Sequence, residues 1–338
     1  MKDFVDFSLK EYNTFGIDVR CSRFVEYESL DELLALLPEV RSAERVVHIG
    51  GGSNLLFTAD FEGMVLHSGI RDVETIASEG DDVLVRAGAG VVWDDFVSRC
   101  VEQGLYGLEN LSLIPGEVGA SAVQNIGAYG SEAGDFIESV ETIDIATGQV
   151  LTLRGDECQY AYRSSIFKTS LRGQRIITHV TYRLSRLFRP QLSYAALRSE
   201  VERRGLLENL TAADVRRIVV EVRREKLPEP SEVGSAGSFF MNPVVERPVF
   251  ERIAAQYPDA PHYDLPDGSV KVPAGWLIQQ CGWRGRNLGR AGVWPKQALV
   301  LVNLGGATGQ DIVELCQRVQ HDVHERFGIQ LKPEVIFV

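Results

Sequence analysis

The spacing of apolar positions predicts several helices along the chain. In each stretch, apolar residues recur every three or four positions and so share one helix face. Ser29 and Glu32 make a capping-box pattern where the first stretch begins, and the second ends near Gly104. In the last stretch, 308–327, His321 is expected on the solvent-facing side of the helix. The residues expected to face the protein interior are Ile312, Leu315, Cys316, Val319 and Val323. The predicted helices cover 29–37, 93 to near 104, 194–204, 211–226 and 308–327.

Shorter runs rich in β-branched residues predict strands between these helices. One pair of runs, 139–153, reads as a hairpin that turns at Thr147 and Gly148. The other predicted strands are Val46–Ile49, Gly63–Ser68, Asp82–Gly88, Arg175–Ser185 and Val335–Val338. Because strands and helices alternate irregularly, the predicted fold class is α+β with several small sheets. The stretch 227–232, which holds two prolines and two acids, is the best internal boundary.

Composition narrows the function classes. The 338 residues carry a net charge of −12 and no basic stripe, so a nucleic-acid partner is not expected. The start, MKDFVDFSLK, has no apolar signal region, and no run of about 18 apolar residues occurs, so a cytoplasmic location without a membrane partner is expected.

The five cysteines lack a C-x-x-C pair, which favours reduced packing thiols. His321 and His324 lie three apart on the wet face of a predicted helix, and no metal site is expected there.

Two segments are unusually rich in small residues. The first follows a strand and comprises Gly50, Gly51, Gly52, Ser53 and Asn54. The second runs from Pro115 to Gly130. Glycine lets backbone N–H groups approach a ligand closely, and consecutive N–H groups can hold phosphate oxygens. Neither segment fits the G-x-G-x-x-G or P-loop pattern. Each alone reads as a tight turn, whereas the two together favour a dinucleotide phosphate site.

Several motifs, spread in order over nearly the whole chain, resemble one family. They are NTFG (13–16), GGGSN, IPGEVGASAVQNIGAYG, YRSSIFK, GSAGSFFMNP, WPKQALVLVN and PEVIFV. Together they are similar to those of UDP-N-acetylenolpyruvoylglucosamine reductases, and the segment LSYAALRSE resembles the loop of the family's first type. The resemblance implies non-covalent FAD, NADPH as reductant, and UDP-N-acetylglucosamine enolpyruvate as the substrate reduced to UDP-N-acetylmuramate for peptidoglycan.

The resemblance also implies an architecture. The expected fold is the FAD-binding fold of the vanillyl-alcohol-oxidase type, with two small α+β subdomains, plus an α+β substrate-binding domain. The expected division is 1–70 with 328–338, 71–226, and 227–327, in a protein that is a monomer. The cofactor residues that it implies are the first glycine segment and, from the second, Pro115, Gly116, Gly119, Ala120, Gln124, Asn125, Gly127, Ala128 and Tyr129.

Three residues match the family's catalytic positions. Ser238 in GSAGSFFMNP has no histidine within twenty residues, so it has no base that would make it a nucleophile. By resemblance it is the proton donor, which suits a hydroxyl aimed at a strongly basic, carbanion-like carbon. Arg163 matches the arginine that binds the substrate carboxylate. Glu334 matches a glutamate at the same centre, and beside a developing enolate it is expected to be protonated or charge-paired, with a raised pKa.

Four more residues match positions that contact the nucleotide sugar: Tyr194, Lys226, Asn242 and Gln297. Arg223 and Arg224, which precede Lys226, are expected on a solvated helix face. Met241 stands where many relatives have lysine, so Lys226 or Lys271 would have to compensate for it. Ser164 stands where an acid is frequent, and this change affects any partner of Arg163.

Two other functions are also consistent with the sequence. One is a flavin oxidase of the same fold that tethers FAD covalently, with His48 or His67 as the attachment point, although each is more simply a strand residue. The other is an inactive nucleotide-sugar binding protein. The joint presence of Arg163, Ser238 and Glu334 opposes the second reading.

Overall fold

The computed structural model describes all 338 residues, and they form two compact units. Unit 1 comprises residues 1–7, 21–51 and 62–223, and unit 2 comprises 8–20, 52–61 and 224–338. Both units are therefore discontinuous in sequence. None of the helices has the length and apolar character that crossing a bilayer requires. The expected division into three domains stays a prediction.

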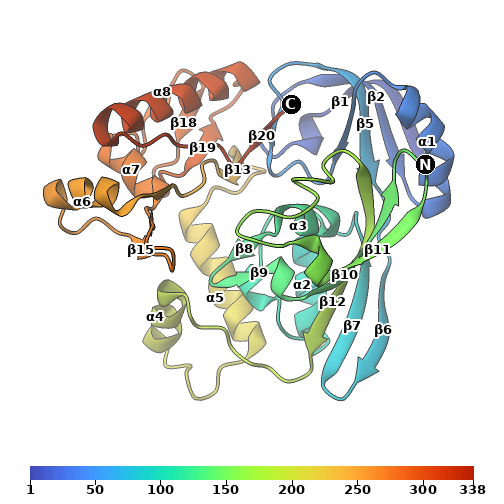
Figure 1. Cartoon of the computed structure of the whole chain (residues 1–338), viewed down its shortest axis with the longest axis horizontal. Helices are drawn as coiled ribbons and strands as arrows, with labels where there is room; N and C mark the ends of the chain where they lie inside the picture. The colour runs from blue at the N-terminus through green and yellow to red at the C-terminus, as the bar shows by residue number, and fades with distance from the viewer. The chain divides into compact units, whose positions relative to one another are not determined.

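Unit 1 begins with a four-stranded sheet in the order β1-β2-β5-β3, in which β3 runs parallel to β5. Helix α1 covers one face of it (Figure 1), because leucines of the helix pack with Val25 and Leu66 of the strands. Ser29 begins this helix, and its hydroxyl accepts a hydrogen bond from the N–H of Glu32 at 3.2 Å. The bounds are β1 (Lys2–Ser8), β2 (Arg20–Tyr27), α1 (Leu30–Ser42), β3 (Val46–Ile49) and β5 (Phe61–Ser68).

A five-stranded antiparallel sheet, in the order β11-β10-β12-β7-β6, forms the larger part of unit 1. Helices α2 and α3 pack on it around Trp93, Phe96 and Tyr182, which are all fully buried. The bounds are β6 (Val73–Glu79), β7 (Asp82–Gly88), α2 (Trp93–Glu102), α3 (Val118–Gln124), β10 (Ile137–Asp144), β11 (Val150–Arg154) and β12 (Arg175–Ser185).

The remaining elements of unit 1 are short or helical. Helices α4 and α5 pack together through Leu197, Val201, Val215 and Val219. Strands β8 and β9 form a small hairpin. The bounds are β8 (Gly127–Ala128), β9 (Ser131–Glu132), α4 (Ala195–Arg203) and α5 (Ala212–Lys226), with 3₁₀ turns at Glu109–Leu111, Ala133–Asp135 and Gly155–Cys158.

Unit 2 is built around the sheet β13-β19-β18-β17, against which α8 packs. The last strand, β20, pairs in parallel with β4, so the chain end returns to residues 280 positions earlier, as the bond from Thr58 to Val338 shows. The bounds are β4 (Leu55–Leu56), β13 (Gly234–Ser238), β14 (Val244–Val245), α6 (Arg247–Gln256), β15 (Tyr263–Asp264), β16 (Val270–Lys271), α7 (Ala274–Gln280), β17 (Asn287–Leu288), β18 (Ala291–Val293), β19 (Val300–Asn303), α8 (Gly309–Phe327) and β20 (Ile336–Phe337), with a 3₁₀ turn at Lys10–Tyr12.

The predicted helices and strands are confirmed, with small shifts at their ends. Helix α8 buries the predicted inward residues and leaves His321 exposed. All five cysteines are free thiols, and four of them are buried. Several elements were not predicted, among them β1, β2, β6, α6 and α7, and also α3, which lies inside the second glycine-rich segment. Its small residues carry no helical stripe of large apolar side chains, which is why the period of the sequence does not reveal it.

We expect Thr308→Ala to lower the free energy of unfolding by about 1 kcal/mol, because Thr308 caps α8. Its hydroxyl accepts from the N–H of Asp311 at 3.2 Å, while the Asp311 carboxylate accepts from the N–H of Thr308 at 2.7 Å. Urea unfolding of Thr308→Ala measures the loss. Thr308→Ser keeps the hydroxyl and is the control, and equal stability of all three proteins would contradict the capping role.

Candidate active site

The two glycine-rich segments touch each other in unit 1. A Cβ placed on Gly51 would lie 3.3 Å from the Cα of Gly116. A Cβ on Gly50 would lie 3.2 Å from Oε2 of Glu117 and 3.3 Å from the Cβ of Ala120. Larger residues at these positions would push the segments apart. We refer to this pair of segments, residues 50–51 and 115–120, as the glycine cradle, because glycine at positions 50, 51 and 116 lets the two backbones approach closely.

Gly119 has a second, structural reason to be glycine. It lies in the first turn of α3, where a Cβ would come within 2.8 Å of the Cβ of Ala89. Its N–H donates to the carbonyl of Ala89 at 2.9 Å. Close packing of α3 against the end of β7 therefore requires glycine at this position, independently of any ligand.

The rest of the first segment belongs to unit 2. Gly52 has φ of +62°, and a Cβ on it would overlap the carbonyl oxygen of Tyr12. Asn54 holds the C-terminal end of the chain: its Nδ2 donates to the carbonyl of Glu334 at 3.2 Å, and its own carbonyl accepts from the N–H of Ile336 at 3.0 Å. Ser53 lies between Gly52 and Asn54 and is half-buried.

The side chains that close the second segment are engaged in unit 1. Asn125 ends α3 in the left-handed conformation, and its amide bonds to Glu132 and to the backbone of Gly134 and Ala161. Gln124 accepts a hydrogen bond from Lys168 at 3.0 Å. The Asn125 side chain thus fixes the turn itself, whereas Gly127, Ala128 and Tyr129 continue into the β8 hairpin.

Arg163 lies against this hairpin. Its Nη2 donates to the carbonyl of Gly127 at 2.8 Å, and its guanidinium lies over the ring of Tyr162. Arg163 has φ of +54°, and Asn125 and Tyr129 also have positive φ. Non-glycine residues rarely adopt this conformation, and they gather at functional sites because the surrounding structure must hold the strain. Arg163 is half-buried, whereas most arginines lie exposed on the protein surface and form ion pairs there.

The segments that carry Ser238 and Glu334 pair with each other in unit 2. Ser238 ends β13, directly after Gly237, whose φ is +66°. The N–H of Glu334 donates to the carbonyl of Phe239 at 2.8 Å, and Phe240 pairs with Pro333. The Ser238 side chain is exposed, whereas Phe239 and Phe240 are fully buried and anchor the strand end. Two of the three predicted catalytic residues are thus on paired segments of unit 2, and Arg163 belongs to unit 1.

The predicted nucleotide-sugar residues divide between the units. In unit 1, Tyr194 is 41% exposed and its ring meets that of Tyr129 edge-on, with centroids 5.4 Å apart. In unit 2, Lys226 is exposed at the end of α5. Asn242 accepts from the N–H of Ala274 at 2.9 Å, which ties it to the start of α7. The carboxamide oxygen of Gln297 lies near Gly275 of the same helix, where a Cβ would be 3.0 Å away.

The expectation for Arg223 was wrong. Arg224 is exposed, but Arg223 is half-buried, and its Nε donates to the carbonyl of Leu113 at 3.2 Å in unit 1. The signal was present in the sequence: Arg223 follows Val219 by four positions and so continues the buried face of α5. The adjacent Tyr129 interacts electrostatically with Arg223, which adds a cation beside the predicted site.

His48 and His67 are engaged in hydrogen bonds. Both ring nitrogens of His67 contact carboxylates, Nδ1 with Glu26 at 2.8 Å and Nε2 with Glu117 at 2.9 Å. Nε2 of His48 lies 2.8 Å from the hydroxyl of Tyr27. A covalent flavin link needs a free ring nitrogen, so the arrangement of His67 opposes covalent attachment there.

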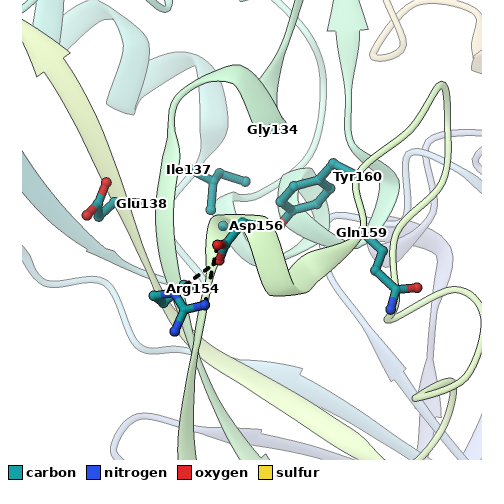
Figure 2. A pocket seen from close by; sticks show the side chains of 8 residues that line it. Gly134, Ile137, Glu138, Arg154, Asp156, Gln159 and Tyr160 are labelled. Atoms are coloured by element: carbon teal, nitrogen blue, oxygen red, sulfur yellow. Dashed lines mark hydrogen bonds and ion pairs between the residues drawn. The ribbon is translucent and has the colours of Figure 1, made fainter.

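A pocket of about 530 Å³ lies elsewhere on unit 1 (Figure 2). Arg154 and Asp156, which form an ion pair at 3.1 Å, line it together with Tyr160. None of the predicted site residues lines it. This pocket is therefore not the candidate active site.

Comparison with known proteins gives consistent matches over the chain. Residues 21–154 match the family model of an FAD binding domain, and residues 229–338 match that of the C-terminal domain of UDP-N-acetylenolpyruvoylglucosamine reductase. Curated reductases of that name from Bacteroides fragilis and Porphyromonas gingivalis are 52% and 46% identical over 332 and 336 residues. These alignments cover 98% of this chain and 99% and 98% of the relatives.

The structures agree as well. The crystal structure of UDP-N-acetylenolpyruvylglucosamine reductase from Thermus caldophilus matches with a TM-score of 0.67. The match covers 99% of this chain and 98% of that one at 24% identity, and so shows a common fold. The expected α+β fold class with an FAD-binding domain is confirmed. With about half of its residues shared with full-length relatives, the chain belongs to the UDP-N-acetylenolpyruvoylglucosamine reductase family.

Proposed function

We propose that this protein reduces UDP-N-acetylglucosamine enolpyruvate to UDP-N-acetylmuramate, with NADPH as reductant and non-covalent FAD as cofactor. The observation that carries the proposal is 52% identity to a curated reductase over 98% of the chain. The product is a precursor of peptidoglycan, so the role is in cell-wall synthesis. The protein acts in the cytoplasm as a monomer under this proposal.

The glycine cradle fits an extended diphosphate cofactor. Positions 50, 51 and 116 leave backbone without side chains where two segments meet, and consecutive N–H groups there can receive phosphate oxygens. The second segment would complete the site through Gln124, Gly127, Ala128 and Tyr129, and the first through Gly52, Ser53 and Asn54. The chemistry that FAD supplies when bound is hydride transfer from NADPH to the terminal carbon of the enol ether.

Three side chains of the protein would complete the reduction. Arg163 would bind the substrate carboxylate, and its guanidinium would stabilise the negative charge that develops there. Ser238 would donate the proton of its hydroxyl to the neighbouring carbon, and no base is needed because that carbon is itself strongly basic. Glu334, whose backbone is held beside Ser238, would lie at the same centre and carry a proton or a paired charge.

The colour of the purified protein tests this proposal. We expect a yellow protein that NADPH bleaches and that the enolpyruvyl substrate recolours. A colourless protein would contradict the proposal and leave the inactive binding protein as the reading. Flavin that stays with the acid-precipitated protein would indicate the covalent oxidase instead. Reduced flavin that the enolpyruvyl substrate does not recolour in the absence of oxygen would exclude the enolpyruvyl ether as the oxidant.

We expect Tyr194→Phe and Lys226→Ala to raise the Michaelis constant for the enolpyruvyl substrate more than they change kcat. Lys226 offers a positive charge to the diphosphate, and Tyr194 offers a hydroxyl beside Tyr129. Losing one such contact corresponds to roughly a 10-fold to 150-fold rise, since a hydrogen bond to a charged group contributes about 1.5–3 kcal/mol. Steady-state kinetics measures it.

Arg224→Ala is the control for Lys226→Ala, because Arg224 is an exposed cation on the same helix. Michaelis constants that remain at the wild-type value in both site variants would place the uridine diphosphate elsewhere.

A further inference from the structure

A buried histidine lies between two carboxylates in unit 1. His67 on β5 contacts Glu26 on the neighbouring strand β2, with 2.8 Å between Nδ1 and Oε2. Its other nitrogen, Nε2, lies 2.9 Å from Oε1 of Glu117. The three residues are only 3%, 2% and 8% exposed, in the order His67, Glu26 and Glu117. We refer to these residues as the buried triad.

The chemistry of the groups favours a charged imidazole. An ionised carboxylate only accepts hydrogen bonds, so contacts on both ring nitrogens require both to carry protons. The Lys2 ammonium contacts Oε1 of Glu26 at 2.5 Å, so two cations offset two anions in the cluster. Burial disfavours a charged His67, but the hydrogen bonds and charges of Glu117 and Glu26 outweigh it, and the pKa of His67 lies above its ordinary value.

The triad lies directly beneath the glycine cradle. Glu117 is part of the second segment and is the residue that precedes α3. One of its oxygens faces His67, and the other would lie 3.2 Å from a Cβ on Gly50. The backbone of Glu117 forms an antiparallel β-bridge with that of Val92. Next to this bridge, the N–H of Val118 donates to the carbonyl of Val91 at 2.9 Å. The Glu117 carboxylate is thus clamped between His67 and the first glycine segment.

We propose that His67 is a positioning residue for the cofactor: as an imidazolium it holds Glu117, and through it the start of α3, at the separation from Gly50 and Gly51 that FAD binding requires. This inference rests on the proposed function, because it assigns FAD to the glycine cradle. Loss of the proton would leave one ring nitrogen facing a carboxylate without a hydrogen between them. The two buried carboxylates would then repel, and the cradle would loosen.

The surroundings set the direction of the pH dependence. The titratable groups around the imidazole are Glu26 and Tyr27 from β2, Glu117, Lys2 through Glu26, and His48, which bonds to Tyr27. Burial raises the pKa of Tyr27, so this phenol stays neutral. Because the folded pKa of His67 is raised, its contribution is fully present below the ordinary histidine pKa of about 6.5 and is lost as the pH rises through the higher folded value.

Titration of apoprotein with FAD, followed by flavin fluorescence, tests the proposal without any substrate. At pH 7 we expect His67→Gln to weaken FAD binding by roughly 10-fold to 100-fold, the range seen when partners that orient a metal ligand are removed. His67→Gln/Glu117→Gln removes the opposing charge together with the imidazolium, and we expect it to bind FAD more tightly than His67→Gln. His321→Gln, an exposed histidine of α8, should bind like wild type.

The pH profile separates a positioning role from a general loss of stability. Wild-type affinity for FAD should fall on the alkaline side of neutrality, whereas that of His67→Gln should change much less over the same range. If His67→Gln apoprotein does not fold by circular dichroism, the wild-type profile decides, and an affinity that is constant from pH 6 to pH 10 overturns the proposal. His67→Gln that binds FAD within twofold of wild type also overturns it.

These outcomes are distinct from a failure of the proposed function. If the wild-type protein binds no FAD, then the assignment of the cofactor to the cradle fails. If it binds FAD and His67→Gln binds it equally well, then only the role of the buried triad fails.

Discussion

Ser238→Ala should slow reoxidation of the reduced flavin by the enolpyruvyl substrate by roughly 10²-fold to 10⁴-fold, the usual scale for a lost general acid. The reason is that, in the proposed mechanism, the carbon next to the site of hydride delivery would receive its proton from the Ser238 hydroxyl. Flavin reduction by NADPH needs no proton from Ser238 and should stay close to the wild-type rate. Stopped-flow measurement of the two half-reactions separates these effects.

The structure favours a clean outcome for this substitution. Ser238 is exposed at the end of β13, and the buried side chains that anchor the strand end are Phe239 and Phe240. Substrate binding should therefore change little, because one neutral hydroxyl contributes only about 1 kcal/mol. Ser238→Cys keeps an ionisable proton and should recover part of the rate.

Ser235→Ala is a control for the loss of a hydroxyl from the same strand; Ser235 lies three residues earlier and is buried, so this change is the more demanding one for the fold. Equal slowing of both half-reactions in Ser238→Ala would show that Ser238 supports the flavin or the fold. The proton would then come from another group.

Gly51→Val should yield a protein that is isolated with little or no flavin colour. A valine side chain at this position would meet the Gly116 backbone, since even a Cβ would be 3.3 Å from its Cα. Overpacking costs about 1–3 kcal/mol, which corresponds to roughly 5-fold to 150-fold weaker FAD binding if the strain falls on the cradle. Flavin content per protein and fluorescence titration of apoprotein measure this loss.

Gly51→Ala provides a graded comparison, because a methyl group alone requires Gly116 to shift by only a few tenths of an ångström. Its affinity for FAD should lie between those of wild type and Gly51→Val. Circular dichroism of the apoproteins checks that the fold persists. A folded Gly51→Val that retains full flavin content would remove the cofactor from this part of unit 1.

Gly119 illustrates why this prediction uses Gly51 instead. In the sequence both glycines have the same explanation, which is close approach of the backbone to a ligand. In the structure, a Cβ on Gly119 would meet the Cβ of Ala89 at 2.8 Å, inside the protein. Loss of flavin from a Gly119 variant would therefore report on helix packing as well as on binding.

Periodic patterns predicted most of the secondary structure. The apolar stripe of α8 and the alternating residues of β12 are local signals, since each depends only on neighbours within one element. Helix α3 was not predicted, because its small residues do not show the helical period of large apolar side chains. The motifs around Ser238, Arg163 and Glu334 indicated the family, since they are specific in order and spacing across the whole chain.

The sequence by itself determined the family, the α+β class and the types of residue at the candidate site. Only the tertiary structure decided which of them meet: it places Glu334 beside Phe239 and buries Arg223 against Leu113. It also joins His67 to Glu26 and Glu117, which are 41 and 50 residues away along the chain. Each of these residues taken alone reads as an ordinary strand or loop residue. Their protonation and their role depend on burial and on partners from other elements. The periodicity of residues within one element reveals neither the burial nor the partners.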